Sequence, residues 1–332
     1  MVAVEVYLKI AGISIRLKSR FSLKPFPVER LNRGYLHFVL KKPVKNPDID
    51  LQLEIVNKLP VYKKKTILFQ TKRDEKELGI NLRSRGKRRS VVIWEISRVG
   101  GRYMLSGGAS GRREYSVDLG PDFKSGIAFV MPEGRLGKID KWNLTQVTHG
   151  FLQILLIHYL AYHRKGIMMH AVGVKDGLSG DLFFGPTQSG KSTMARIWHR
   201  NTQAVILNDD RIAMTKKGKR FFIHGTPWNG DFRDYTPMQA GSAALGAAFF
   251  LDGHTVQNQA RTIFHTELFS ALFPQTLSVF WDKSSADFIS GFLMDMARHV
   301  MCYHLKFADN EEIVNYVRSL RKNRSFEPAL RI

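Results

Sequence analysis

One stretch of eight residues constrains the fold of this chain more than any other. It fits the phosphate-binding loop (Walker A) pattern G-x-x-x-x-G-K-[ST] at every position, in the order Gly185-Pro186-Thr187-Gln188-Ser189-Gly190-Lys191-Ser192. The apolar run 181–184 before it is typical of a buried strand, and residues 193–198 after it are typical of the first turns of a helix. The pattern therefore predicts a strand, a glycine loop and a helix, in which the helix N-terminus and loop N–H groups face an anion.

This arrangement predicts binding of ATP with Mg²⁺. The residues expected at the nucleotide are Gly185, Pro186, Thr187, Gln188, Ser189, Gly190, Lys191, Ser192 and Thr193. Lys191 is expected to reach the outer phosphates, and the Ser192 hydroxyl is expected to bind Mg²⁺.

A second signal is the pair Asp209-Asp210, which follows the apolar run 204–207 and begins 18 residues after Lys191. We expect the pair at the carboxyl end of a parallel strand beside the strand of the loop, where open α/β sheets place their ligands. One carboxylate could then hold Mg²⁺ while the other accepts a proton from an acceptor hydroxyl. Two adjacent aspartates at the end of a strand also occur simply as a turn signal.

A third element lies before the loop. The run 166–174 predicts a strand that forms a hairpin with the strand of the loop, and it carries His170, 21 residues before Lys191. A lone histidine in an apolar strand is more often a core residue than a functional one.

Taken together, these elements resemble the catalytic domain of the HPr kinase/phosphorylase family over residues 165–330. The later segment Gly225-Thr226-Pro227-Trp228 resembles shorter, divergent HPr-kinase-like proteins, some of which act in peptide-modification pathways. The Glu- and Gly-rich signature of the bifunctional enzymes has no counterpart here. Phosphoenolpyruvate carboxykinases have a related core but are much longer chains.

The resemblance implies an α/β fold with a P-loop, HPr-kinase-like C-terminal domain. It also implies a Mg²⁺- and ATP-dependent kinase that phosphorylates a Ser or Thr hydroxyl of a protein or peptide, and a homo-oligomer. The implied catalytic residues are Lys191, Asp209, Asp210 and His170, and the implied metal ligands are Ser192, Asp209 and Asp210. The alternatives are a small-molecule kinase, an ATPase and a nucleotide-sensing module.

The periodicity of the chain predicts three segments. Residues 1–141 alternate in short runs such as 4–8, 51–55 and 91–96, which predicts a β-rich N-terminal domain. The apolar stretch 144–163 is interrupted by Gln and His, so within residues 142–164 we expect a packed bridging helix rather than a membrane span. Residues 165–332 form the kinase-like domain, with helices expected over 286–306 and 311–320.

The net charge is +22, and by count residues 1–150 carry 30 basic and 14 acidic side chains, or +16 of that total. The excess includes Lys63-Lys64-Lys65 and the run 83–89. Such a run is more often a solvated basic hairpin, and the alternative is a surface that docks an acidic peptide or carrier protein as the phospho-acceptor. No known nucleic-acid-binding motif accompanies the charge, so nucleic acid is not the expected partner. The single cysteine, Cys302, and an N-terminus without a signal-peptide pattern predict a cytoplasmic protein.

Overall fold

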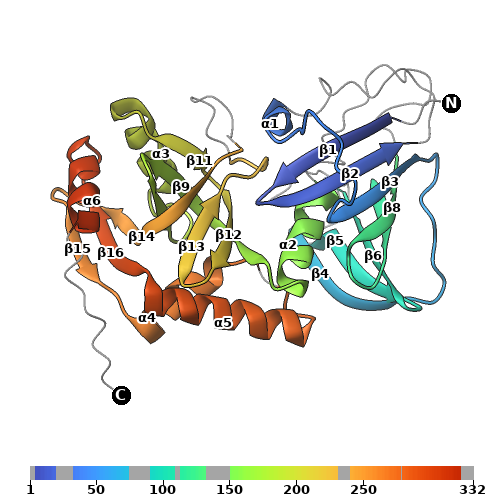
Figure 1. Ribbon diagram of the computed structural model, residues 1–332. Coiled ribbons are helices and arrows are strands. Elements are labelled where there is room, and N and C mark those ends of the chain that lie inside the picture. The colour runs from blue at the N-terminus through green and yellow to red at the C-terminus, as the bar shows by residue number, and fades with distance from the viewer. Residues whose placement is uncertain are drawn as a thin grey trace. The chain divides into compact units, whose positions relative to one another are not determined.

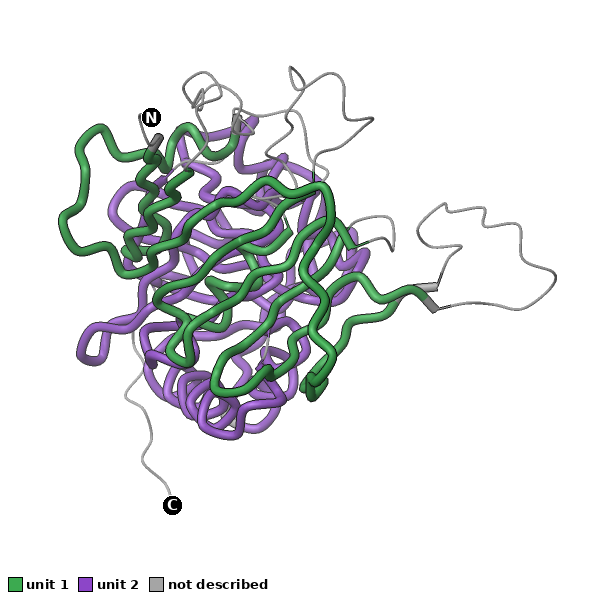
Figure 2. Tube along the Cα trace, turned by 90° about the vertical axis from the view of Figure 1, so that its right-hand side faces the viewer, with its two compact units in different colours: residues 1–159 green, residues 160–332 purple. Residues whose placement is uncertain are grey.

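The computed structural model describes residues 4–19, 33–74, 90–108, 113–131, 150–230, 240–277 and 279–322. The chain divides into two compact units, residues 1–159 and 160–332 (Figure 2). Each unit contains a large β-sheet. The architecture is therefore mixed α/β. The division between the units falls inside the segment that we expected to bridge two domains.

The first unit is built on an eight-stranded sheet in the order β1-β2-β3-β8-β7-β6-β5-β4 (Figure 1). The strands predicted around residues 4–8, 51–55 and 91–96 are confirmed as β1, β3 and β5. Strands β2, β3 and β8 run parallel to one another, and the other neighbouring pairs are antiparallel. The elements of this unit are β1 Val4–Ile10, β2 Ile13–Ser19, α1 Arg33–Leu36, β3 Ile49–Ile55, β4 Thr66–Asp74, β5 Ser90–Val99, β6 Arg102–Gly107, β7 Tyr115–Leu119 and β8 Ser125–Val130.

Helix α2 (Leu152–Tyr162) confirms the helix predicted in the bridging segment; residues 142–149 lie outside the described part. Its His158 is buried, with its ring against Trp94 and Phe123, and its Tyr159 hydroxyl donates to Asp48 at 3.2 Å. These contacts show that residues 158 and 159 of α2 pack within the first unit. Among the described helices, none is both long and apolar enough to cross a membrane.

The second unit contains a sheet in the order β10-β9-β12-β13-β14-β16-β15, with β11 also paired to β9. Its strands are β9 Gly166–Asp176, β10 Ser179–Phe184, β11 Val205–Asn208, β12 Arg211–Lys217, β13 Arg220–His224, β14 Ser242–His254, β15 Gln259–Thr262 and β16 Met301–Phe307. Its helices are α3 Lys191–Asn201, α4 His265–Leu272, the 3-10 turn η4 Phe273–Gln275, α5 Lys283–His299 and α6 Glu312–Lys322.

Five strands of this unit form a closed circuit. β10 pairs with β9 in the predicted hairpin, β9 with β12, β12 with β13, and β13 with β14, and β14 then pairs in parallel with β10. Helices α3 and α6 cover the apolar cluster on one side, where Trp198 and Val317 meet Phe183 and Phe249. Helix α5 packs through Phe292 edge-to-face on Phe221 of β13.

The prediction of one helix over residues 286–306 is wrong at its C-terminal end. Helix α5 ends at His299, and residues 301–307 form strand β16. Strand β16 pairs in parallel with β14, and its Cys302 and Leu305 are buried. The pairing with β14 therefore overrides the helical spacing of these apolar residues. The second predicted helix, over 311–320, is confirmed as α6.

One carboxylate in this core is unusually placed. Asp181 of β10 is fully buried, and neither of its oxygens accepts a hydrogen bond from any residue that the structure describes. The guanidinium of Arg321, 3.4 Å away, is its ion-pair partner and also pairs, together with Arg318, with Asp176. Burial raises the pKa of Asp181 to about 7, which the attraction of Arg321 only partly opposes.

This raised pKa predicts a pH-dependent stability. The Asp181 carboxyl titrates near 3.8 when exposed and near 7 in the fold, so the folded chain binds its proton more tightly. The stability that this proton contributes is therefore lost as the pH rises from about 4 to about 7. We expect Asp181→Asn to gain stability over the native chain at about pH 8 relative to about pH 5, as measured by urea unfolding.

Asp287→Asn is the matched control, because Asp287 is exposed on α5. Parallel stability profiles for Asp181→Asn and the native chain across this pH range would contradict the assignment.

Candidate functional site

The glycine loop has the predicted local structure. Strand β10 ends at Phe184, helix α3 begins at Lys191, and residues 185–190 connect them. Gly190 precedes the helix with a left-handed φ of 97°, and Gln188 has a φ of 67°. Pro186, Thr187 and Gln188 are exposed, as is Ser192 in the first turn of α3, so this part of the loop faces solvent.

Two close approaches explain the glycines of the loop. A Cβ on Gly185 would lie 2.6 Å from the Leu251 carbonyl oxygen of β14. A Cβ on Gly190 would lie 2.7 Å from the ring of Phe307 at the end of β16. The loop therefore packs its backbone directly against two strands, and no side chain fits between them.

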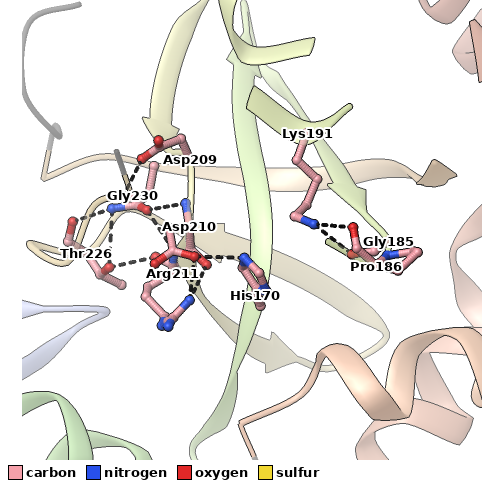
Figure 3. Close-up of polar contacts among 10 residues, drawn as sticks. His170, Gly185, Pro186, Lys191, Asp209, Asp210, Arg211, Thr226 and Gly230 are labelled. Carbon is pink, nitrogen blue, oxygen red and sulfur yellow. Dashed lines mark hydrogen bonds and ion pairs between the residues drawn. The ribbon is translucent and has the colours of Figure 1, made fainter. Parts of the chain in front are cut away.

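The Lys191 side chain bends back over this loop. Its Nζ donates to the carbonyl oxygens of Gly185 at 2.7 Å and Pro186 at 2.8 Å (Figure 3). The residue is 8% exposed, and burial lowers the pKa of its ammonium, while the negative charge of Asp210 opposes that change. Lys191 is thus tied to the loop and interacts electrostatically with Asp210.

The aspartates lie in a different strand arrangement from the one predicted. Strands β11 and β12 both pair antiparallel with β9 along one of its edges, and β10 pairs along the other edge. The expectation of a neighbouring parallel strand is therefore wrong, because β9 separates the aspartates from β10. Residues 209 and 210 occupy the break between β11 and β12, where the Ala171 N–H donates to the Asp210 carbonyl at 3.2 Å.

Asp210 is held by two positively polarised groups. Its Oδ1 lies 2.8 Å from His170 Nε2, and the Arg211 guanidinium also donates to it (Figure 3). Burial favours the neutral acid, but the His170 hydrogen bond and the charges of Arg211, His170 and Lys191 outweigh it, so the pKa of Asp210 is below its ordinary value. The carboxylate is therefore ionised at neutral pH and fixed in direction.

Asp209 points elsewhere. It is 4% exposed, and its Oδ1 accepts a hydrogen bond from the Gly230 N–H at 3.0 Å. A Cβ on residue 230 would lie 3.0 Å from the other Asp209 oxygen, so the close approach of this backbone favours glycine. The two adjacent carboxylates thus have separate environments, and Asp210, with a side chain 22% exposed, is the more accessible one.

Sequence reasoning missed the residues that support this turn. The Asn208 side chain is fully buried; its oxygen accepts from the N–H groups of Asp210 at 2.8 Å and Arg211 at 2.7 Å, and its nitrogen donates to the Thr226 carbonyl at 2.8 Å. The Thr226 hydroxyl in turn donates to the Arg211 carbonyl at 2.6 Å. The available signal was Asn208 itself, since asparagine side chains commonly bond to backbone two residues further on.

His170 lies in the middle of β9, opposite Arg211 of β12. Its side chain is 35% exposed rather than enclosed in the core. The structure therefore brings His170, Asp210 and Arg211 into direct contact, with Asp209 in the same turn. Lys191 joins them through its charge.

The predicted metal ligands are two carboxylates and one hydroxyl. Within the described part of the chain, no three or more His, Cys, Asp or Glu side chains are grouped as a metal site. No family model matches this chain, and a search of curated proteins finds no similar sequence.

The close contact at Gly190 gives a testable prediction. Gly190→Ala adds both the strain of a positive φ and a clash with Phe307, whereas Gly177→Ala adds the strain alone, since nothing lies within 4 Å of a Cβ there. We expect Gly177→Ala to lower the free energy of unfolding by about 1 kcal/mol and Gly190→Ala by about 2–4 kcal/mol. Denaturant unfolding measures both, and equal losses would show that the packing against Phe307 is not tight.

Proposed function

We propose that this protein is a Mg²⁺- and ATP-dependent kinase that phosphorylates a serine, or less readily a threonine, of a protein or peptide. In this proposal the second unit has an HPr-kinase-like fold. The observation that carries the proposal is the juxtaposition of two parts. The first part is a glycine loop with a phosphate-binding sequence, which carries Lys191. The second is the ionised carboxylate of Asp210, which His170 and Arg211 hold in place and whose charge acts on Lys191.

The glycine loop would hold the ATP phosphates. Pro186, Thr187 and Gln188 of the loop and Ser192 at the start of α3 are exposed, so this side of the loop is where an anion would meet backbone N–H groups. Lys191, whose ammonium bonds the loop carbonyls, would move its donors to the β- and γ-phosphates. This change replaces carbonyl partners with charged oxygens, which bind an ammonium more strongly.

The oxygen donors needed for Mg²⁺ are present in Ser192, Asp209 and Asp210, and this donor class fits the ion. Mg²⁺, when bound, would neutralise charge on the β- and γ-phosphates. Ser192 is exposed at the start of α3, and Asp209 is held by Gly230. Asp210 is the more exposed carboxylate and is therefore the one that an acceptor hydroxyl can reach, so we assign the more buried Asp209 to metal binding.

Asp210 is then the general base. Its carboxylate takes the proton of the acceptor hydroxyl as the oxygen of that hydroxyl bonds to the γ-phosphorus and the bond to ADP breaks. His170 and Arg211 keep the carboxylate ionised and oriented, so little reorganisation is needed at the moment of transfer. His170 is therefore a positioning residue in this mechanism.

A protein or peptide acceptor is favoured by the charge of the first unit. Residues 1–150 carry a net charge of +16, which attracts acidic segments. Within Lys63-Lys64-Lys65, Lys65 is already paired with the buried carboxylate of Glu95, while Lys63 and Lys64 are exposed. The run 83–89 lies outside the described residues. An acidic acceptor suits this surface.

The test is transfer of label from γ-labelled ATP with Mg²⁺ to candidate peptides and proteins, with small molecules and free phosphate resolved separately. We expect Lys191→Ala to abolish transfer. We expect Asp210→Asn to keep ATP binding but to lose roughly 10²-fold or more in rate, as for removal of a general base. Lys217→Ala and Asp287→Asn are matched controls, since both side chains are exposed and neither belongs to the proposed site.

Each other outcome points to a different function. Label only in a small molecule would indicate a small-molecule kinase, and label only in free phosphate would indicate an ATPase. ATP-dependent stabilisation without turnover, across a panel of acceptors, would indicate a nucleotide-sensing module. A native rate in Asp210→Asn would contradict the base assignment.

A further inference from the structure

A cavity of about 770 Å³ lies in the second unit, away from the glycine loop. It lies at a gap between β13 and β16, which pair with the same edge of β14 at different positions. β13 pairs with this edge as far as Ala244, and β16 begins to pair at Ala247. Leu245 and Gly246 line the cavity between these pairings, and on their other edge Leu245 pairs with Gly180 of β10.

Other elements complete the walls. The C-terminal turn of α5, with Arg298 and His299, lies on one side, and the segment from Thr262 to Phe264 lies on another. The latter is held to β16 by the bond from the Ile263 N–H to the Cys302 carbonyl at 3.0 Å. The cavity is therefore bounded by hydrogen-bonded strands and a helix, which gives it a fixed shape.

The cavity is separate from the glycine loop. It is lined by Ser179, where β10 begins, whereas the loop follows Phe184, where β10 ends. Six strand residues between these points span about 20 Å. A ligand in the cavity would thus occupy a site other than the proposed ATP site.

The charge of the lining has one sign. It includes Lys219, Arg220, Arg298 and His299, and no Asp or Glu. His299 is bonded to Asp295, and Arg220 lies over the ring of Phe222, but Lys219 and Arg298 are exposed and form no ion pair with any described residue. Two cations at the rim are therefore available to an anion.

The rest of the lining is largely apolar. Phe264 is 47% exposed and Leu178 is 96% exposed, and the half-buried Leu245, Val300 and Met301 continue this surface. Apolar side chains exposed beside a cavity gain free energy when a ligand covers them. From this combination we propose that the cavity binds a small organic anion with an apolar body, whose acidic group meets Lys219 and Arg298.

The probe for the test is 1-anilinonaphthalene-8-sulfonate, an aromatic anion that fluoresces when bound, titrated into the full chain. Its uncharged analogue N-phenyl-1-naphthylamine reports the apolar contribution alone. Neither titration contains ATP, so the result does not depend on the proposed kinase activity.

The double variant Lys219→Glu with Arg298→Glu reverses both rim charges. We expect it to weaken the anionic probe about fivefold or more and to leave the neutral probe nearly unchanged. Lys63→Glu with Lys64→Glu is the matched control, because it makes the same charge change at exposed residues of the first unit. Phe264→Ala is expected to weaken both probes.

Three results would overturn the proposal: no binding of the anionic probe by the native chain, equal binding by both double variants, or an equal loss for both probes in the Lys219→Glu, Arg298→Glu chain. Thermal unfolding of each variant verifies that it is folded. Since neither cation has a partner among the described residues, we expect unchanged unfolding midpoints.

Discussion

The buried carboxamide of Asn208 is the contact on which the arrangement of the site depends. It joins the turn at residues 209–211 to the segment at Thr226, through hydrogen bonds to backbone groups and to the Thr226 hydroxyl. A buried amide with satisfied donors and acceptors fixes a unique geometry, whereas an unsatisfied one costs free energy. The turn that results directs Asp209 towards Gly230 and Asp210 towards His170. Two neighbouring negative charges thereby acquire separate hydrogen-bond donors.

The ionisation of the site is a property of the group rather than of single residues. Burial alone would favour a neutral Lys191 and a neutral Asp210, and the attraction between them opposes both tendencies. His170 and Arg211 add to the balance on the aspartate side only. Changing the charge of Lys191, His170 or Arg211 therefore alters the pKa of Asp210, so the effect of a substitution at one of them includes an effect transmitted through that carboxylate.

The sequence was sufficient for features set by local pattern. The β9–β10 hairpin, the loop, the start of α3 and helix α6 follow from apolar runs, glycines and helical spacing. It was insufficient where strands pair over long distances. The same apolar run at 204–207 would suit a parallel or an antiparallel neighbour, and the residues at 301–307 suit a helix or a strand until β14 is in place. The roles of Arg211 and Thr226, and the cavity beside Leu245, depend on such pairings and have no local signature.

The closed circuit of strands also bears on how the chain folds. The β9–β10 hairpin joins residues close in sequence, but Ser179 of β10 pairs with Ala244, 65 residues later. Contacts of such separation form slowly, because the entropy of closing the intervening chain is lost before the pairing compensates for it. The glycine loop rests on Leu251 and Phe307, which belong to the late-arriving strands β14 and β16. During synthesis the loop sequence therefore emerges well before the surfaces that give it its shape, and it acquires that shape only when the C-terminal part of the chain has joined the sheet.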